Sequence, residues 1–186
     1  MMTVHEALEV IARNRGEQIV ITTMTAVAIW PELSDTPLDF AYMPSAMGQA
    51  PGLAQGLALA SARGVIVIHG DGCTLMNLGC LVTLAHTPAD VTLIILDNAL
   101  YEVTGGQPPA GAGRTDFAAL ARAAGIGRVY AFSEHNDWQS LGPQALNGKG
   151  PAVIHLRVEG RMGQKAPRPH RTMSDQIQRL REAICR

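Results

Sequence analysis

Aromatic residues are scarce in this chain: Phe, Trp and Tyr make up 4% of its 186 residues, although 47% are hydrophobic. A core of this composition is built mainly from Ala, Val, Ile and Leu, which is typical of a parallel sheet covered by closely packed helices. The length suits one α/β domain with a substantial core.

The chain also lacks an excess of charge and a long apolar run. Its 15 Lys and Arg nearly balance its 16 Asp and Glu, and no basic patch of the kind that binds nucleic acid dominates. No apolar run approaches the roughly 20 residues of a membrane span. Residues 3–15 form an amphipathic pattern and not a signal peptide. We therefore expect a cytoplasmic protein with neither a nucleic-acid nor a membrane partner.

The chain has few cysteines, and their number and spacing do not suggest disulfide bonds. Cys73, Cys80 and Cys185 are odd in number and form no Cys-x-x-Cys, so they are predicted to be reduced thiols. Cys73 and Cys80 are spaced for one face of a helix, where packing is their ordinary role. No His and Cys spacing fits a zinc site.

Hydrophobic patterns along the chain alternate between helical and extended. Predicted helices cover residues 3–15, 26–33 (interrupted at Pro31), 49–62, 73–87, 116–124 and 134–146, and predicted strands cover residues 18–22, 39–43, 65–68, 91–96, 128–132 and 151–158. This alternation predicts a three-layer αβα, doubly wound and mostly parallel sheet.

The domain is predicted to end near residue 160. Residues 160–172 are basic, contain prolines and lack an apolar period, and a terminal helix is predicted over 174–185. Residues 161–186 are thus an extension packed on the domain or on a partner. Residues 160–172 are either a solvated connection or an arm that wraps a partner subunit or helps to cover an active site.

Chemistry-bearing residues follow two neighbouring predicted strands. Gly70-Asp71-Gly72 ends one apolar run, and Asp97-Asn98 ends the next. Because ligands of open α/β sheets bind at the carboxyl ends of strands, an acidic and an amide oxygen meet there. Such donors suit Mg²⁺, and glycine allows a phosphate to approach the backbone closely.

These motifs resemble the signature of thiamine diphosphate-dependent enzymes, in which Asn98-Ala99-Leu100-Tyr101 follows the Gly-Asp-Gly segment. The resemblance implies that Asp71, Asn98 and the backbone carbonyl of Leu100 hold the Mg²⁺ that grips the cofactor's diphosphate. It implies further cofactor-binding roles for Ser45, Gly70, Gly72, Cys73 and Tyr101.

Three further residues carry open alternatives. Met47, next to Gly48, matches the bulky residue that supports the cofactor's bend in related enzymes, although Met also fills cores. Thr23, in the segment after the first strand, contacts the diphosphate in one interpretation; in the other, Thr25 caps a helix. Glu102 is either an acid/base group or a solvated loop carboxylate.

Two histidines flank the first motif and its following helix. His69 is expected to point away from the metal into helix packing. His86, near the end of the predicted helix, is a candidate for a substrate pocket or an ordinary surface residue.

Within the family, the chain is similar to the sulfopyruvate and phosphonopyruvate decarboxylase branch. Residues 70–79 and 101–107 carry most of this likeness, which runs from about residue 19 to 158. The chain departs from the branch at Cys73, where Ser is usual, and at Glu102, where Gly is usual. It also has Pro31-Glu32-Leu33 where the branch has Arg-Glu-Leu, which leaves the exact 2-oxo acid open.

Members of the family activate the cofactor with a Glu from a second, pyrimidine-binding domain, for which this sequence leaves no room. The resemblance therefore implies the beta-type subunit of a split decarboxylase, which needs an alpha-type partner subunit, pairs with a second copy of itself, and binds cofactor weakly alone. The alternatives are a carboligase or another 2-oxo acid decarboxylase subunit, and a non-catalytic thiamine diphosphate-binding domain.

Overall fold

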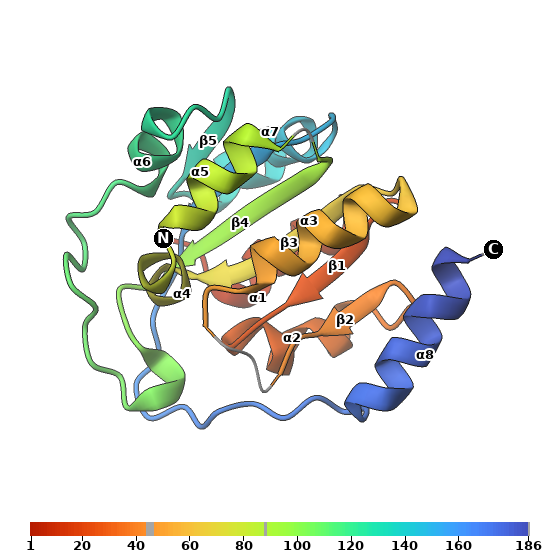
Figure 1. Cartoon of the computed structure of the whole chain (residues 1–186). Helices are drawn as coiled ribbons and strands as arrows, with labels where there is room; N and C mark the ends of the chain where they lie inside the picture. Colours follow the sequence, from red (N-terminus) through yellow and green to blue (C-terminus); the bar gives the residue numbers. More distant parts are fainter. Residues whose placement is uncertain (44–46, 88, 186) are drawn as a thin grey trace.

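A six-stranded sheet in the order β2-β1-β3-β4-β6-β5 forms the centre of the protein (Figure 1). The computed structural model describes residues 1–43, 47–87 and 89–185. The strands are β1 (Ile19–Thr22), β2 (Asp39–Ala41), β3 (Val65–Gly70), β4 (Val91–Asp97), β5 (Arg128–Phe132) and β6 (Ala152–Arg157). Each of their pairings is parallel, which confirms the predicted α/β class.

Helices cover both faces of this sheet. They are α1 (Val4–Asn14), α2 (Thr25–Leu33), α3 (Ala50–Ser61), α4 (Asp71–Met76), α5 (Gly79–His86), the short 3₁₀ helix η1 (Glu102–Thr104), α6 (Phe117–Ala123), α7 (His135–Leu146) and α8 (Met173–Ile184). Residues of α1, α2 and α7 pack in one core cluster, and residues of α3, α5, α6 and α8 pack in the other. The predicted three layers are therefore present. In the described residues, no helix is both long and apolar enough to cross a bilayer.

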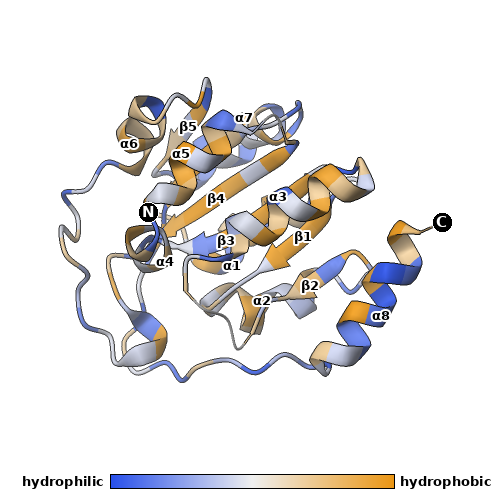
Figure 2. Ribbon diagram, viewed as in Figure 1, coloured by the Kyte–Doolittle hydropathy of each residue, from blue (hydrophilic) through white to orange (hydrophobic). Residues whose placement is uncertain are grey.

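Alternation along the strands divides the core between the two faces. Ile66 and Ile68 belong to the cluster under α1, α2 and α7, whereas Val65 and Val67 belong to the cluster under α3 and α5. All four are fully buried, and Figure 2 shows the central strands as almost continuously hydrophobic. A strand buried on both faces has this continuous apolar pattern, which is why the sequence predicts these strands well.

Strand order places a crevice between β1 and β3. The chain runs from β1 outward to β2 and then returns to the other side of β1 with β3. Such a reversal separates the loops that follow the two strands, and ligands of open α/β sheets bind at that point. The loop after β1 contains Thr23 and Met24, and α4 begins at Asp71 directly after β3.

The helix predicted over residues 73–87 is wrong as one element, because α4 and α5 are separate. Asn77, between them, has a non-helical backbone, and its Nδ2 donates a hydrogen bond to the carbonyl of Gly48 at 2.8 Å. A Cβ on Gly48 would lie 2.6 Å from that of Asn77, and Gly48 has φ +85°. The close approach of these two segments, which periodicity does not reveal, interrupts the helix.

Pro31 does not interrupt α2, contrary to the prediction. The helix continues to Leu33 with Pro31 inside it. A proline removes one backbone hydrogen bond, but the neighbouring Trp30 is 2% exposed and packs in the core. Burial of this face therefore maintains the helix.

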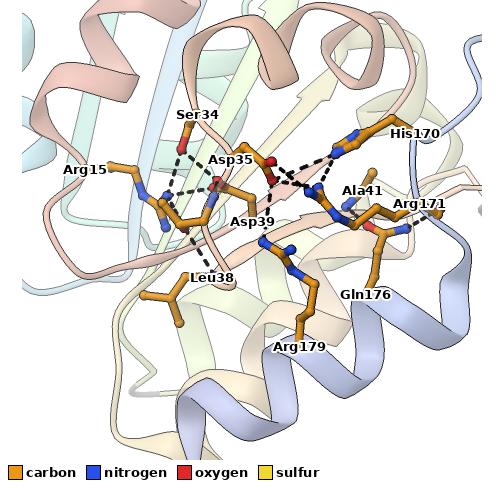
Figure 3. A network of polar contacts seen from close by, with 11 residues as sticks. Arg15, Ser34, Asp35, Leu38, Asp39, Ala41, His170, Arg171, Gln176 and Arg179 are labelled. Carbon is orange, nitrogen blue, oxygen red and sulfur yellow. Dashed lines mark hydrogen bonds and ion pairs between the residues drawn. The ribbon is translucent and has the colours of Figure 1, made fainter.

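The C-terminal extension returns to the far edge of the sheet. Residues 160–172 run across the molecule to α8, which lies beside edge strand β2 (Figure 1). Gln176 Oε1 accepts a hydrogen bond from the Ala41 backbone N–H at 2.7 Å, which satisfies an edge donor of the kind that otherwise promotes aggregation. Arg171 forms two hydrogen bonds with Asp35, at 2.6 and 2.7 Å (Figure 3).

The same edge is anchored from the other side by a buried arginine. Arg15 is 6% exposed, and its guanidinium lies 2.6 Å from Oδ1 of Asp39, the first residue of β2 (Figure 3). Ser34 Oγ and the backbone N–H of Thr36 donate to Oδ2 of Asp39, both at 2.7 Å. The paired charges therefore keep the short strand β2 in register.

Candidate active site

Asp71 stands at the point where β3 ends and α4 begins. Its side chain is buried, at 2% exposed, and the preceding Gly70 is the N-cap of α4 without a side-chain cap. Burial, the largest cause, and the neighbouring Asp97 together raise the pKa of Asp71 to about 7. The backbone N–H groups of Gly72 and Ala99 act in the opposite direction. A buried carboxyl beside a second carboxyl is poorly stabilised as an anion, and a bound cation relieves this.

Asp97, at the end of β4, connects Asp71 to a histidine on β6. Nε2 of His155 lies 2.9 Å from Oδ2 of Asp97, and both residues are less than 10% exposed. The His155 ring also meets Phe117 edge to face, with ring centroids 5.4 Å apart. Asp71, Asp97 and His155 thus form one buried polar row that runs from the ends of β3 and β4 to the interior of β6.

The segment after β4 has a strained backbone. Ala99 has φ +57°, in the left-handed region that residues other than Gly, Asn and Asp rarely adopt. Oδ1 of Asn98 accepts a hydrogen bond from the Leu100 backbone N–H at 3.0 Å, which closes this turn. Strain of this kind is characteristic of functional sites, and here it places the Asn98 side chain and the Leu100 residue on one tight loop.

Asp71, Asn98 and Leu100 line one small cleft of about 40 Å³, referred to here as the cofactor cleft. The predicted residues that line it are Met47, Gly70, Asp71, Gly72, Cys73, Asn98, Leu100, Tyr101 and Glu102. Met24 and Thr25, after β1, also line it. The structure therefore brings together, at the reversal of strand order, residues that lie far apart in the sequence.

One predicted residue lies outside the lining of the cleft, and another is not among the described residues. Thr23 is 3% exposed, and its hydroxyl donates a hydrogen bond to the Ile68 carbonyl at 3.2 Å, so in the structure it contacts β3 and does not line the cofactor cleft. Ser45 lies outside the described residues.

Glu102 is not a solvated carboxylate, and that alternative is wrong. It is 3% exposed, and its two oxygens have separate partners. Thr25 Oγ1 donates to one oxygen, and the backbone N–H of Arg161 donates to the other at 2.6 Å. Thr25 is consequently not a helix cap either, since Met24 occupies the N-cap of α2 without a side-chain hydrogen bond. Glu102 is therefore buried by contacts with residues that are distant in the sequence, and no local pattern indicates such contacts.

Gly72 is required by the packing of Tyr101. A Cβ at this position would lie 2.5 Å from Cε1 of the tyrosine ring, closer than real Cβ atoms approach. The Gly-Asp-Gly motif therefore serves the contact between α4 and the segment after β4 as well as the exposure of its backbone.

The two histidines considered from the sequence lie away from the cleft. His69 is buried, and its Nε2 lies 2.9 Å from Oγ1 of Thr74, as expected for packing against the following helix. His86 ends α5 and is exposed. Because α4 and α5 cross from the carboxyl end of β3 toward the amino end of β4, the interpretation of His86 as a pocket residue is wrong.

Sequence reasoning missed His155 and assigned no role to Asp97. The available signal was a polar residue within the apolar strand β6, since its neighbours Ile154 and Leu156 are fully buried. The partner of such a residue is set by strand order, which the sequence does not specify.

The donor set fits a hard cation. Asp71 supplies a carboxylate, Asn98 an amide oxygen and Leu100 a backbone carbonyl, and Mg²⁺ prefers a few oxygen ligands of this kind together with phosphate and water. Among the described residues, no group of three or more His, Cys, Asp and Glu side chains forms a metal site, so a site here depends on the amide and carbonyl oxygens.

Comparison with known proteins identifies a protein family that matches most of this chain. Residues 21–156 match the family described as "Thiamine pyrophosphate enzyme, C-terminal TPP binding domain". The chain is 34% identical over 171 residues to a phosphonopyruvate decarboxylase of Streptomyces viridochromogenes, covering 91% of this chain and 43% of that protein. It is 38% identical over 128 residues to the sulfopyruvate decarboxylase subunit beta of Methanothermobacter thermautotrophicus, covering 68% of this chain and 65% of that protein.

Solved structures with the same fold include a putative thiamin diphosphate-dependent enzyme from Mycobacterium smegmatis. Its TM-score is 0.70 at 21% identity, over 85% of this chain and 32% of that one. A benzoylformate decarboxylase from Polynucleobacter necessarius gives a TM-score of 0.69 at 20% identity, over 86% and 33% of the two chains. At these identities the likeness establishes the fold.

Proposed function

The chain belongs to the thiamine pyrophosphate enzyme family through its C-terminal TPP-binding domain, and from this we propose that it is the diphosphate-binding subunit of a 2-oxo acid decarboxylase. The proposed substrate is a sulfopyruvate- or phosphonopyruvate-like acid, because relatives at 34–38% identity carry those names. The observation that carries the proposal is the meeting of Asp71, Asn98 and Leu100 in one cleft.

The cofactor cleft supports binding of Mg²⁺ and thiamine diphosphate. Asp71, the Asn98 amide oxygen and the Leu100 carbonyl would hold the metal, and the backbone N–H groups of Gly72 and Cys73 would donate to phosphate oxygens. Met47, which is partly buried and lines the cleft, would support the bend of the cofactor. When bound, the cofactor supplies an electron sink for the loss of CO₂ from a 2-oxo acid.

A second subunit is part of the proposal. The cofactor cleft encloses only about 40 Å³, whereas small-molecule sites typically enclose ≈300–1,000 Å³. The remaining walls, and the activating Glu, would come from a pyrimidine-binding alpha-type subunit. Three similar proteins are themselves named beta subunits.

Pairing of two copies of this chain is the expected homo-oligomeric contact. Leu59 on α3 and Val82 on α5 are 61% and 60% exposed, on the helices that cover one face of the sheet. Met76, at the end of α4, and Leu78, just before α5, are 48% and 39% exposed. Exposed apolar side chains on the helices of one face favour association.

A carboligase, or a decarboxylase for another 2-oxo acid, is the alternative activity. The observation that favours it is Pro31-Glu32-Leu33 in α2, where the similar branch has an arginine. A binding domain without catalytic activity is the third possibility, and the same experiment separates all three.

The test is reconstitution with the pyrimidine-binding partner. We expect the lone chain to bind Mg²⁺ and thiamine diphosphate weakly and to release no CO₂, and the complex to convert 3-sulfopyruvate or 3-phosphonopyruvate to the corresponding aldehyde. Asp71→Ala should abolish Mg²⁺-dependent cofactor binding measured by calorimetry, with an unchanged far-UV spectrum. Asp137→Ala, at an exposed position on α7, is the matched control.

Each other outcome has a definite meaning. Substantial turnover by the lone chain refutes the split-subunit proposal, and ligated products from the complex establish the carboligase. Unchanged cofactor affinity in Asp71→Ala refutes the metal site.

A further inference from the structure

A second, larger cleft of about 390 Å³ lies beside the cofactor cleft. Its walls come from the start of α1, from α2, from η1 and from residues 161–167 of the C-terminal extension. Thr25, Glu102 and Val103 line both clefts. The two clefts therefore adjoin, with these three residues in their common wall.

The segment after β4, which contains Asn98, Leu100 and Glu102, holds the start of the C-terminal extension at this place. The buried Glu102 accepts the backbone N–H of Arg161 at 2.6 Å. A Cβ on Gly160 would lie 2.7 Å from the carbonyl oxygen of Asn98 and from Cδ1 of Leu100. These approaches fix the chain directly beside the proposed metal ligands, so the segment is a wall of the site and not a free connection.

The distribution of charge differs between the two clefts. Among the described residues that line the cofactor cleft, none is Lys, Arg or His. The second cleft contains Arg161 and Lys165, and among the described residues neither side chain forms an ion pair. Its acids are Glu32 and Glu102, and Glu102 already accepts two hydrogen bonds.

A short 2-oxo acid with a second anionic group needs a cation outside the reacting centre. Its carboxylate leaves as CO₂, whereas its sulfonate or phosphonate keeps its charge throughout. A guanidinium matches the oxygens of such a group with paired donors, and an ammonium adds a compact charge. Arg161 and Lys165 are the cations that this chain places next to the cofactor cleft.

We propose that Arg161 and Lys165 bind the sulfonate or phosphonate of the substrate and so determine the preference for dianionic 2-oxo acids. This inference rests on the proposed function and adds to it the residues that select the substrate. It gives the C-terminal extension a role in recognition and explains why the extension is fastened to Glu102.

The test uses the reconstituted complex with three substrates. Arg161→Gln and Lys165→Gln should each raise KM for 3-sulfopyruvate and 3-phosphonopyruvate by about tenfold, the loss expected for one hydrogen bond to a charged group. Their kcat values, and KM for pyruvate, should stay within twofold of the wild type. Arg168→Gln is the matched control, because Arg168 lies on the same segment outside the lining of the cleft.

A binding measurement separates this inference from the decarboxylase activity. Calorimetry with sulfoacetate and phosphonoacetate, which do not react, should show binding that the double variant loses, with acetate as the monoanionic control. Equal loss of kcat/KM for all three substrates indicates a structural role and overturns the inference, as does unchanged KM or unchanged anion binding. A wild-type complex that is inactive on all three acids refutes the proposed function. In that case the calorimetry still tests, without any activity assay, whether Arg161 and Lys165 bind the anion.

Discussion

Nε2 of His155 and Oδ2 of Asp97 lie 2.9 Å apart in the interior of the protein. The two residues come from neighbouring strands, β6 and β4, and Asp97 is in turn next to Asp71. A histidine thus supports the acid that adjoins the proposed metal ligand. Polar rows of this kind orient metal ligands in many sites.

Removal of this histidine should destabilise the fold. His155→Leu leaves the buried Asp97 carboxylate without its partner, and the expected loss of unfolding free energy is about 3 kcal/mol. Urea denaturation measures it. His155→Gln retains a hydrogen-bond donor and should lose clearly less. Equal stability of the wild type and the leucine variant would contradict the role of the pair.

The ionised side chain of Asp71 should lower the free energy of unfolding of the cofactor-free protein. Its pKa of about 7 lies above the ordinary value of 3.8, so between these values the native state binds the proton more tightly than the unfolded chain does. Stability is therefore lost as pH rises from about 4 to 7. At pH 8 the free energy of unfolding of Asp71→Asn should exceed that of the wild type by about 4 kcal/mol.

The pH dependence supplies the control for this variant. The difference between Asp71→Asn and the wild type should become small at about pH 3, below the ordinary pKa of 3.8, where the wild-type carboxyl is protonated in the native state and mostly protonated in the unfolded chain. Denaturation at the two pH values measures it. A difference independent of pH would mean that packing, and not charge, is responsible.

Glu102 should control the C-terminal extension. Glu102→Ala removes the acceptor for the Arg161 backbone N–H and for the Thr25 hydroxyl, which favours local opening of residues 160–172. Tryptic cleavage after Arg161 and Lys165 should accelerate roughly tenfold, as the loss of one hydrogen bond predicts. Glu182→Ala, on the exposed side of α8, should leave the rate unchanged. A rate unaffected by Glu102→Ala would show that other contacts hold the segment.

The three thiols should differ in reactivity. Burial raises the pKa of Cys80 to about 11 and also raises that of Cys73, whereas Cys185 is exposed. Because the thiolate is the reactive form, iodoacetamide at pH 8 should label Cys185 first. Mass spectrometry locates the label, and Cys185→Ser should remove the fast phase. Rapid labelling of Cys73 in the folded protein would contradict its burial.

Local pattern accounts for the sheet and for the ends of its central strands. The apolar runs that became β3 and β4 are buried on both faces, so their hydrophobicity alone marks them as strands. Each run ends in a motif, Gly70-Asp71-Gly72 or Asp97-Asn98, and parallel pairing then necessarily puts the two motifs at one edge. The proposed metal ligands were therefore accessible from sequence and resemblance.

The burial of individual acids was not accessible in this way. Glu102 looks like a loop residue because its partners, Thr25 and Arg161, lie 77 and 59 positions away. Asn77 looks helical because the contact that breaks the helix comes from Gly48.

By itself, the sequence determined the α/β class and the order of most helices and strands, because periodicity is a local property. The strand-end motifs, together with the family resemblance, indicated the residues that could hold a metal and a diphosphate. Only the tertiary structure decided that His155 pairs with Asp97, that Glu102 holds the extension, and that Arg161 and Lys165 line a cleft that adjoins the cofactor cleft. Those relationships depend on strand order and on long-range packing, which no local pattern encodes.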